Sequence, residues 1–516
     1  MPYFATAVRC GRNGAFHSRK GKIYMSIIKI TNLTFGYEGN YDNVFENVNF
    51  QIDTDWKLGF IGRNGRGKTT FLNLLLGKYP YEGTIHASVN FEYFPYYVEN
   101  VSQYTIDVMH EICPAAEDWE LLKEVSLLDV NVEALYRPFE TLSNGERTKV
   151  LLAALFVGSN RFLLIDEPTN HLDAEARQKI GNYLQKKKGF ILVSHDRELL
   201  DACVDHILSI NRSDIVVQQG NFSSWWNNKQ MQDEYELAEN QKLKKEIIRL
   251  EEASKRTANW ADKVEKSKHG TTNSGSKLDK GYVGHKSAKM MKRAKNQEER
   301  MQSVIGEKAK LLKNIEQTDD LKMASIPYSK EIMLNAAQLS LYYGDRQVCS
   351  DINFKLRQGD RISVTGKNGC GKSTLLKLIC GEAIKYSGSL DVGSGIKISY
   401  VSQDTSFLKG SLSDYAERYS INESLMKTIL RKMGFERSQF DKNMEDFSEG
   451  QKKKVLLARS LCEQAHLYIW DEPLNYIDVL SRMQIEELLL QYQPTILFVE
   501  HDKVFRDKIA TAELCL

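Results

Sequence analysis

The stretch from Lys57 to Thr70 reads KLGFIGRNGRGKTT, and the stretch from Arg361 to Thr374 reads RISVTGKNGCGKST. Each begins with five residues typical of a buried strand, continues through a glycine-rich turn and ends on Gly-Lys followed by a hydroxyl side chain. Glycines let backbone N–H groups close around an anion, lysine supplies positive charge, and the hydroxyl can bind a divalent cation. The pattern predicts a phosphate-binding loop between a strand and a helix, twice in one chain.

The repetition extends well beyond these loops. Four features recur in the same order: the loop lysine, a small-residue motif (LSNGE at 142–146, FSEGQ at 447–451), an acidic pair after an apolar strand, and a histidine after another strand. The offsets are 304 for Lys68 and Lys372, 305 for Ser143 and Ser448, 305 for Asp166-Glu167 and Asp471-Glu472, and 306 for His195 and His501. A drift of two residues indicates that one whole domain has been duplicated. Short apolar strands alternating with helical patterns predict that each copy is an α/β domain with a largely parallel sheet.

Bulk composition excludes several classes of protein. The chain has 516 residues, 27% of them charged and 42% apolar, with a net charge of +2, so its overall charge indicates no partner. No apolar run approaches the roughly 20 residues of a membrane-spanning helix. Eight cysteines without C-x-x-C spacing favour reduced thiols in a cytosol over a disulfide frame or a zinc site.

Four segments follow from these patterns. Residues 1–24 hold five Arg or Lys and no Asp or Glu. This extension could be a transit peptide or, as we favour, an upstream start or tag, and it takes no part in the fold prediction. The first domain is predicted over 25–221, an interdomain linker over 222–329, and the second domain over 330–516.

The predicted linker has a different character from the domains. Leu243, Ile247 and Leu250 in its first half and Met301, Ile305, Leu312 and Ile315 in its second recur at helical spacing, separated by a Gly, Ser, Thr and Lys-rich loop at 266–286. We expect a long antiparallel helical hairpin whose loop lies about 50–60 Å from the domains. Residues 255–295 contain 12 Lys or Arg and 3 Asp or Glu. The hairpin is therefore either a solvated spacer or, as we favour, a basic finger directed at a polyanion.

Each repeated feature has a chemical role that ATP hydrolysis requires. Glu167 and Glu472 are candidates for the catalytic bases that activate water, and His195 and His501 for contacts to the γ-phosphate. Tyr37 and Tyr343 precede the loops and could stack on adenine, although core packing is the commoner role of such a tyrosine. The loop residues predicted to bind ATP are Gly62, Asn64, Gly65, Gly67, Lys68, Thr69 and Thr70, and Gly366, Asn368, Gly369, Gly371, Lys372, Ser373 and Thr374. The residues predicted to bind Mg²⁺ are Thr69, Asp166, Ser373, Gln403 and Asp471.

With these motifs placed, residues 25–516 resemble the ATP-binding cassette family, and more narrowly its ABC-F class, which has two cassettes and a helical linker on one chain and no membrane domain. TDWKLGFIGRNGRGKTT (54–70), FILVSHDR (190–197), YIWDEPLNYID (468–478) and MMKR (290–293) are similar to the Lsa-type antibiotic resistance subgroup. The short spacing between 96 and 142 leaves no room for the arm insertion of housekeeping members. The resemblance implies an ATPase that uses ATP and Mg²⁺.

The resemblance also implies that the cassettes pair head to tail within a monomer. One ATP would lie between the first loop and the second signature, Ser448 and Gly450. The other would lie between the second loop and the first signature, Ser143 and Gly145. Several residues depart from the family pattern: Tyr96 stands where the second cassette has Gln403, and Glu449, Leu474, Tyr476 and Glu500 replace usual residues. We therefore expect two unequal sites, both with a catalytic glutamate.

By the same resemblance the protein is cytoplasmic and binds the E site of the bacterial 70S ribosome, contacting 23S rRNA and P-site tRNA, with no membrane partner. It would protect the peptidyl transferase centre from lincosamides, pleuromutilins and streptogramin A. The tip residues expected to contact the ribosome are Lys277, Leu278, Lys280 and Tyr282. Two alternatives remain open: a housekeeping translation factor of the same class, and the ATPase subunit of a transporter.

Overall fold

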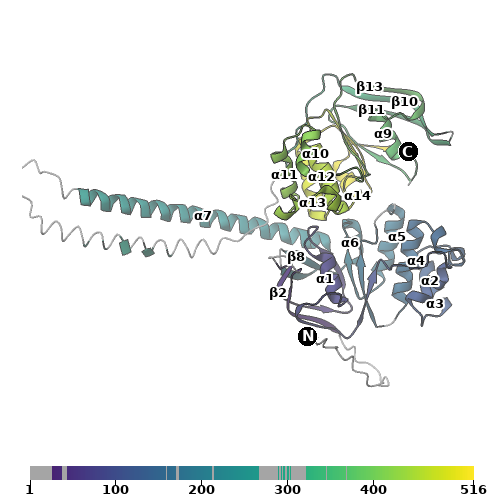
Figure 1. The fold of residues 1–516 in the computed structure, drawn as a ribbon, viewed down its shortest axis with the longest axis horizontal. Coiled ribbons are helices and arrows are strands. Elements are labelled where there is room, and N and C mark those ends of the chain that lie inside the picture. Colours follow the sequence, from purple (N-terminus) through teal and green to yellow (C-terminus); the bar gives the residue numbers. More distant parts are fainter. Residues whose placement is uncertain are drawn as a thin grey trace, which may run out of the picture.

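The structure of the protein is a computed structural model that describes residues 26–37, 43–158, 160–169, 172, 174–211, 214–266 and 321–516 without 345 and 368, with a few single positions between 289 and 303. Two α/β domains lie against each other, and one long helix leaves the first of them (Figure 1). The predicted duplication is thus confirmed at the level of the fold.

The first domain contains two sheets. The smaller is antiparallel, in the order β2(Phe45–Asp53), β1(Ile27–Phe35), β4(Glu82–His86). The larger is parallel except at its last strand, in the order β5(Asn90–Phe94), β6(Arg161–Asp166), β7(Phe190–Val193), β3(Lys57–Ile61), β8(His206–Asn211), β9(Asp214–Gln219). Its helices are α1(Lys68–Leu75), α2(Thr105–Ile112), α3(Asp118–Leu127), η1(Val132–Tyr136), η2(Phe139–Thr141), α4(Asn144–Val157), α5(Ala174–Gln185) and α6(Arg197–Cys203).

The second domain repeats this arrangement. Its antiparallel sheet has the order β11(Arg346–Arg357), β10(Ile332–Tyr343), β13(Lys385–Val392), and its parallel sheet the order β14(Ile398–Val401), β15(Leu467–Asp471), β16(Ile496–Val499), β12(Arg361–Thr365), β17(Ala512–Cys515). Its helices are α9(Lys372–Ile379), α10(Leu412–Arg418), α11(Glu423–Lys432), η4(Arg437–Gln439), η5(Met444–Asp446), α12(Glu449–Cys462), α13(Val479–Tyr492) and α14(Lys503–Ile509).

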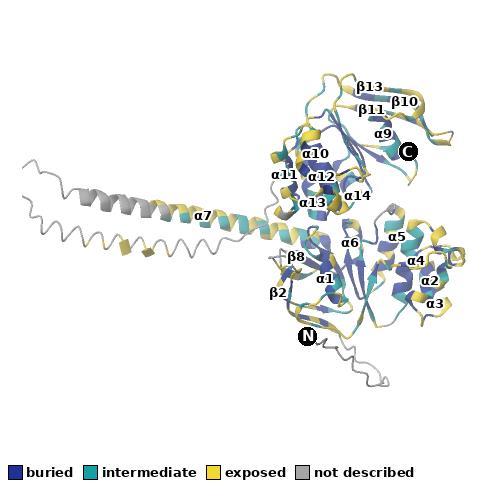
Figure 2. Ribbon diagram, viewed as in Figure 1, coloured by how far each residue is buried: buried dark blue, intermediate teal, exposed yellow. Residues whose placement is uncertain are grey.

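The apolar runs that end in acidic pairs are central strands with both faces covered. In β6, Phe162 and Leu164 pack into one buried cluster of the first domain, whereas Leu163 and Ile165 pack into another. Burial on both faces explains why the run is continuously apolar and does not alternate with polar residues. Figure 2 shows these strands as the buried interior of each domain. Their carboxyl ends, including Asp166, therefore emerge from a rigid core.

The linker begins as predicted with one long helix. Helix α7(Phe222–Lys266) has 45 residues and is anchored in the first domain by Phe222 and Trp225, which are 3% and 4% exposed. At 1.5 Å per residue it extends about 68 Å, which agrees with the long reach seen in Figure 1. Most of the second helix and all four predicted tip residues lie outside the described residues. In the part of the chain that the structure covers, no helix combines the length and apolar character needed to cross a membrane.

The start of the second domain differs from the predicted boundary at 330. Leu321 and Met323 are buried in the core cluster of the second domain. Ser325 bridges Ala465, and the Tyr328 hydroxyl donates a hydrogen bond to the carbonyl of Ser394 at 2.8 Å. These contacts join residues 321–329 to the second domain.

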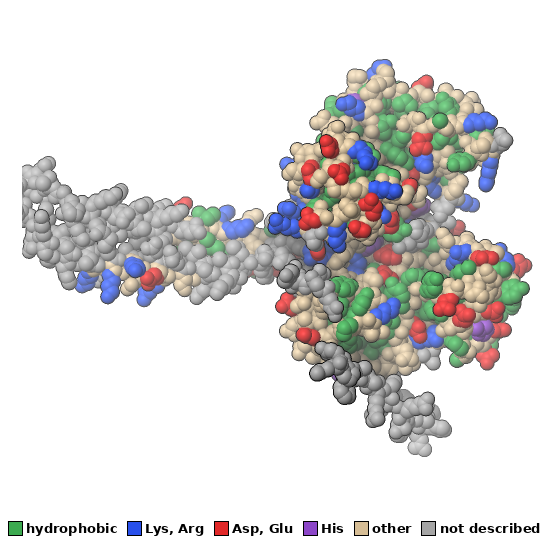
Figure 3. Space-filling model, viewed as in Figure 1, with side chains coloured by type: hydrophobic (Ala, Val, Ile, Leu, Met, Phe, Trp, Pro, Cys, Tyr) green, Lys and Arg blue, Asp and Glu red, His purple; other side chains and the backbone are tan. Residues whose placement is uncertain are grey.

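Charge is distributed unevenly between the two copies. The helical segment 96–142 of the first domain has ten Asp or Glu and two Lys or Arg, whereas the matching segment 403–447 has eight and seven. Figure 3 shows acidic side chains gathered over the outer edge of the first domain, where α2 and α3 lie. The duplicated domains have therefore kept one fold and acquired different surfaces.

The close approach of Gly388 to the neighbouring strand β10 provides a test of the fold. Gly388 has φ +91°, and a Cβ there would lie 2.2 Å from the carbonyl oxygen of Gln338 on the neighbouring strand β10. We expect Gly388→Ala to cost on the order of 3 kcal/mol, because it adds backbone strain to a clash with backbone atoms, and to lower Tm by roughly 5 °C or more. Gly381→Ala is the control, since Gly381 has φ +92° with nothing within 4 Å. Equal Tm values for the two variants would contradict the close strand approach.

Candidate active site

Both glycine-rich loops connect a strand to a helix as the sequence predicts. The first joins β3 to α1 and the second joins β12 to α9. Gly67 and Gly371, which precede these helices, have φ +91° and +101°, a conformation that L side chains rarely adopt. The ammonium groups of Lys68 and Lys372 fold back and donate to the first carbonyl of their own loops, at 2.6 and 2.9 Å. The end of each lysine side chain is thus held at the start of its own loop.

A cavity of about 750 Å³ lies beside the second loop. Nine of the residues that the sequence predicts for this site line it: Tyr343, Gly369, Gly371, Lys372, Ser373, Thr374, Gln403, Glu472 and His501. Asn368 lies outside the described residues. Further lining residues that were not predicted are Asn144, Arg177, Arg346, Gln347, Val348 and Asn475.

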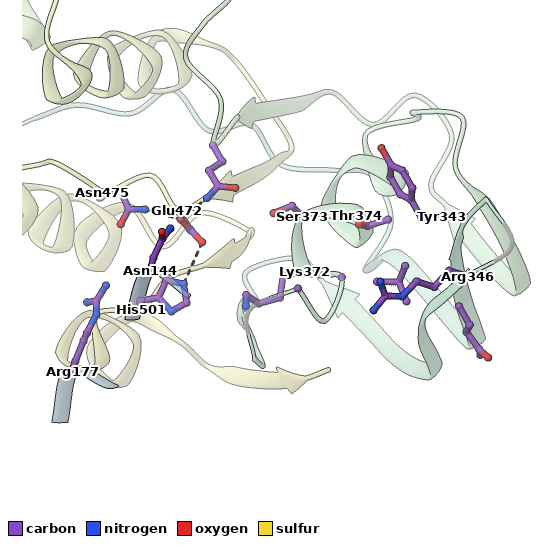
Figure 4. Close-up of a pocket in the computed structure, with 15 residues that line it drawn as sticks. Asn144, Arg177, Tyr343, Arg346, Lys372, Ser373, Thr374, Glu472, Asn475 and His501 are labelled. Carbon is purple, nitrogen blue, oxygen red and sulfur yellow. Dashed lines mark hydrogen bonds and ion pairs between the residues drawn. The ribbon is translucent and has the colours of Figure 1, made fainter. Parts of the chain in front are cut away.

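The cavity has two chemically distinct ends. Figure 4 shows Tyr343 and Arg346 at one end, Glu472 and His501 at the other, and Lys372 between them. Tyr343 is 77% exposed, so its ring face is open to a planar partner. The equivalent Tyr37 instead bonds through its hydroxyl to Thr70 at 2.8 Å and packs against Phe35. The layout matches a ligand with an aromatic group at one end and phosphates at the other.

The first domain contributes two side chains to this second cavity. Asn144 is the residue of the LSNGE signature that lines it, whereas the hydroxyl of Ser143 caps α4 by accepting from the Glu146 N–H at 3.2 Å. Arg177 on α5 also lines the cavity. The sequence carried a signal for this arginine, because Arg177 and Arg482 recur at the repeat offset of 305.

Glu472 is held as an ionised carboxylate at the phosphate end. It accepts hydrogen bonds from Gln403 at 2.8 Å and Asn475 at 2.6 Å, and His501 Nε2 lies 3.2 Å away. Although burial opposes ionisation, the His501 hydrogen bond and the charges of two nearby lysines keep the pKa of Glu472 below its ordinary value. Its backbone φ of +47° is unusual for a non-glycine residue, and such strain concentrates at functional sites.

Asp471 has the properties of a ligand for a hard cation. Its carboxylate is fully buried, and both oxygens lack a partner in hydrogen-bond geometry within the described structure, although the Ser373 hydroxyl is near enough to favour the charged form. Burial raises the pKa of Asp471. An uncompensated buried carboxylate is costly, and a divalent cation would relieve that cost. Within the described residues no group of three His, Cys, Asp or Glu side chains could hold a metal ion, so a cation here would take further ligands from hydroxyl and amide side chains, phosphates and water.

The second domain contacts the first loop directly. Asn64 donates a hydrogen bond through its side chain to the carbonyl of Tyr476 at 2.6 Å, and its N–H lies 3.4 Å from Asp478. The signature residue Gly450 is at the same contact, where a Cβ would come within 3.1 Å of the Asn64 side chain. The two loops therefore face opposite signatures crosswise: Gly450 of the second signature lies at the first loop, and Asn144 of the first signature lines the cavity beside the second loop. That the two sites are unequal in activity stays a prediction.

The acidic residues of the first site differ from those of the second. Asp166 accepts hydrogen bonds from Thr69 at 3.1 Å and from Tyr93, which was not predicted, at 3.0 Å. Burial and the neighbouring Asp166 raise the pKa of Glu167 to about 8. His195 lies 3.4 Å from Glu167, and burial together with the charge of Lys68 lowers its pKa, which keeps the imidazole neutral.

Two departures from the family pattern make contacts that the sequence did not predict. Glu449, next to Gly450 in the second signature, accepts a hydrogen bond from Thr405 at 2.6 Å and pairs with Lys452 at 3.1 Å within its own domain. Glu500 is buried and accepts a hydrogen bond from the N–H of Leu474 at 2.7 Å. It therefore shapes the loop that reaches the first site.

A buried cluster of charges joins the domains behind both sites. Arg197 on α6 of the first domain forms a two-pronged ion pair with Glu486 on α13 of the second, which is 0% exposed. Arg197 also lies 3.5 Å from Asp502, and Asp502 pairs with Arg482 at 3.2 Å. Burial alone would raise the pKa of Asp502, but the two arginines hold it below its ordinary value.

Two facing α/β domains, each with a phosphate loop, an acidic pair and a histidine, and each completed by the other, define an ATP-binding cassette ATPase. The comparisons agree with this class. The sequence matches the pattern of the ABC transporter family twice, over residues 45–170 and 349–475. The chain belongs to this family, and within it to the ABC-F class; it binds and hydrolyses ATP.

Several proteins are similar along most of the chain. The ribosome protection protein VmlR of Bacillus subtilis (strain 168) is 29% identical over 499 residues, covering 95% of this chain and 86% of that protein. The probable ATP-binding protein YheS of Escherichia coli (strain K12) is 26% identical over 502 residues, covering 89% and 74%. Among solved structures, an archaeal ribosome recycling factor in complex with a ribosomal stalk protein has a TM-score of 0.61 at 17% identity, covering 94% and 87%. That last likeness shows a shared fold.

The charge cluster yields a prediction about the domain contact. Arg197→Ala removes the two-pronged partner of the buried Glu486, which keeps an ion pair with Lys508 at 3.1 Å, and one of the two arginines beside Asp502. We expect the change to cost about 3 kcal/mol and to separate the domains. Spin labels on α6 and α13 would report a longer and broader distance. Lys503→Ala, at the equivalent but exposed position, should change neither distance nor Tm. An unaltered distance in Arg197→Ala would contradict the role of the cluster.

Proposed function

We propose that the protein is a cytoplasmic ABC-F ATPase that binds the ribosomal E site and protects the peptidyl transferase centre from lincosamides, pleuromutilins and streptogramin A. ATP binding closes the two cassettes, the linker tip reaches the drug site, and hydrolysis permits release. The observation that carries the proposal is the joint presence of paired cassettes and a helix of about 68 Å leading to a strongly basic segment. Similarity to a ribosome protection protein over 95% of the chain supports it.

The second cavity supports a division of labour among its residues. Tyr343 and Arg346 bind the base, the loop around Lys372 binds the phosphates, and Glu472 accepts the proton of the attacking water. His501, 3.2 Å from Glu472, orients that carboxylate toward the γ-phosphate. The equivalent residues of the first site are Lys68, Glu167 and His195, opposite Gly450; Ser448, like Ser143, caps the signature helix.

Mg²⁺ fits the residues present. Asp471, Ser373 and Gln403 would hold it at the second site, and Asp166 and Thr69 at the first. When bound, the ion neutralises charge that develops on the phosphates. The protein residues position the nucleotide and the water around it.

The two alternatives make different demands on the molecule. A transporter subunit needs a membrane partner and gives α7 no role. A housekeeping translation factor accounts for α7 as well, so the discriminating feature is drug resistance. We expect expression of the protein in a drug-sensitive bacterium to raise its tolerance of lincomycin and tiamulin. Unchanged tolerance, with ribosome binding intact, would favour the housekeeping role.

The release step can be tested by blocking hydrolysis. The double variant Glu167→Gln and Glu472→Gln removes both proton acceptors, so in ATP it should stay closed and accumulate on 70S ribosomes, measured by sedimentation. Turnover should fall by at least a hundredfold. Undiminished turnover in this variant would exclude both glutamates as the bases.

Ribosome binding should also depend on salt through the basic linker. Each neutralised phosphate releases counterions, so affinity should fall steeply as salt rises. Replacing Lys277 and Lys280 with glutamine should flatten that slope, whereas replacing Lys186 and Lys188 on the first cassette should leave it unchanged. An unaltered slope in the tip variant would place the RNA contact elsewhere.

A further inference from the structure

Arg177 brings a guanidinium group from the first domain into the cavity of the second. It lines the same end as Glu472 and His501, opposite the end occupied by Tyr343 (Figure 4). The side chain therefore lies at the end of the cavity that would take the terminal phosphate of a nucleotide.

The protein holds this arginine in a fixed direction. Its Nε donates to the carbonyl of Leu172 at 3.0 Å, and its Nη1 lies 3.6 Å from Asp196. Its side chain is 14% exposed. A guanidinium has five N–H donors, so these two contacts orient the group and leave further donors for a ligand. The carbonyl of Leu172 and the carboxylate of Asp196 thus hold the Arg177 guanidinium at the cavity of the second domain.

The duplicated arginine repeats the geometry at the other site. Arg482 donates through Nε to the carbonyl of Ile477 at 2.9 Å and pairs with Asp502 at 3.2 Å. Its charge opposes the rise in the pKa of Glu167 that burial causes and, after burial and Lys68, helps to lower the pKa of His195, so Arg482 lies near the opposite catalytic pair. Both copies have therefore kept an arginine that reaches across the interface.

The two arginines differ in how firmly they are held. Arg482 shares Asp502 with Arg197 and is part of the buried cluster. Arg177 has a longer contact to Asp196, whose carboxylate also caps α6 by accepting from the Leu199 N–H at 3.1 Å. Arg177, the less tightly held of the two arginines, is the one that lines the cavity beside the second loop.

We propose that Arg177 acts in trans as a catalytic residue of the second ATP site, binding the γ-phosphate oxygens when the cassettes close. In the step it assists, the water oxygen forms a bond to the γ-phosphorus and the bond to the bridging oxygen breaks. The electron pair of that bond leaves with ADP, and a proton from the water passes to Glu472. A planar guanidinium matches phosphate oxygens in two-pronged geometry and stabilises the charge that accumulates on them.

This role makes hydrolysis in one cassette depend on the position of the other. Because Arg177 belongs to the first domain, the second site would be complete only in the closed arrangement. The inference rests on the proposed assignment of Lys372 and Glu472 to the second ATP site.

The test uses the full-length Glu167→Gln protein, in which turnover reports the second site. In that background Arg177→Ala should lower kcat for ATP by about a hundredfold or more, with KM changed less than about threefold, and Arg177→Lys should be intermediate. Added methylguanidinium should restore part of the kcat of Arg177→Ala, which a purely structural role would not allow. Lys179→Ala is the matched control on α5, where Lys179 pairs with Asp129 at 2.5 Å at the surface, and it should keep full turnover.

The possible results distinguish a wrong assignment of the second ATP site from a wrong role for Arg177. If Glu472→Gln in the same background leaves turnover intact, the assignment of the second site is wrong and this inference falls with it. If Glu472→Gln abolishes turnover while Arg177→Ala keeps its kcat, only the role of Arg177 is refuted. A loss of kcat that methylguanidinium does not restore also overturns the proposal.

Discussion

The buried ion pair between Arg197 and Glu486 is the contact on which the arrangement of the two cassettes depends. A guanidinium and a carboxylate removed from water are costly apart and acceptable together, so the pair tolerates little displacement. Its position in the sequence matters as much as its energy. Arg197 is two residues after His195, and its second partner Asp502 directly follows His501. The cluster therefore lies immediately behind His195 and His501, the two histidines predicted to contact the γ-phosphates, so the contact between the domains is close to both of these residues.

Within this shared frame the two sites have diverged. Glu500 binds the backbone of Leu474, and the same loop presents the carbonyl of Tyr476 to Asn64 of the first phosphate loop. Three residues that look like separate departures from the family pattern thus form one physical unit, whose effect is to bring the second domain against the first loop. The second loop instead faces a cavity of about 750 Å³ lined from both domains. The two loops therefore differ in their surroundings: a backbone carbonyl of the second domain contacts the first loop, whereas side chains of both domains line the cavity beside the second loop.

Much of this architecture could be predicted because local motifs and a long-range repeat gave the same answer. The strands at 57–61 and 361–365 coincide with β3 and β12, and the phosphate loops open onto helices as expected. What the sequence did not provide is mostly geometry between elements distant along the chain. Nothing local to Tyr93 indicates that its hydroxyl reaches Asp166, and nothing local to Leu321 indicates that it packs into the second domain. Arg177 lies between these two cases. Its recurrence as Arg482 is visible in the sequence, but its place in the cavity of the opposite domain is known only from the way the two domains pair.

The uneven surfaces of the two copies have a further consequence. The segment 96–142 carries eight more acidic than basic residues, while residues 255–295 in the linker carry nine more basic than acidic ones. Helix α7 carries the start of this basic segment, residues 255–266, away from α2 and α3 (Figure 1). The separation of opposite charges makes a large electric dipole, although the chain as a whole is almost neutral. In the field of a polyanion such a dipole experiences a torque before any contact is made. The protein would approach its target already rotated, with the linker leading and the acidic edge of the first cassette trailing.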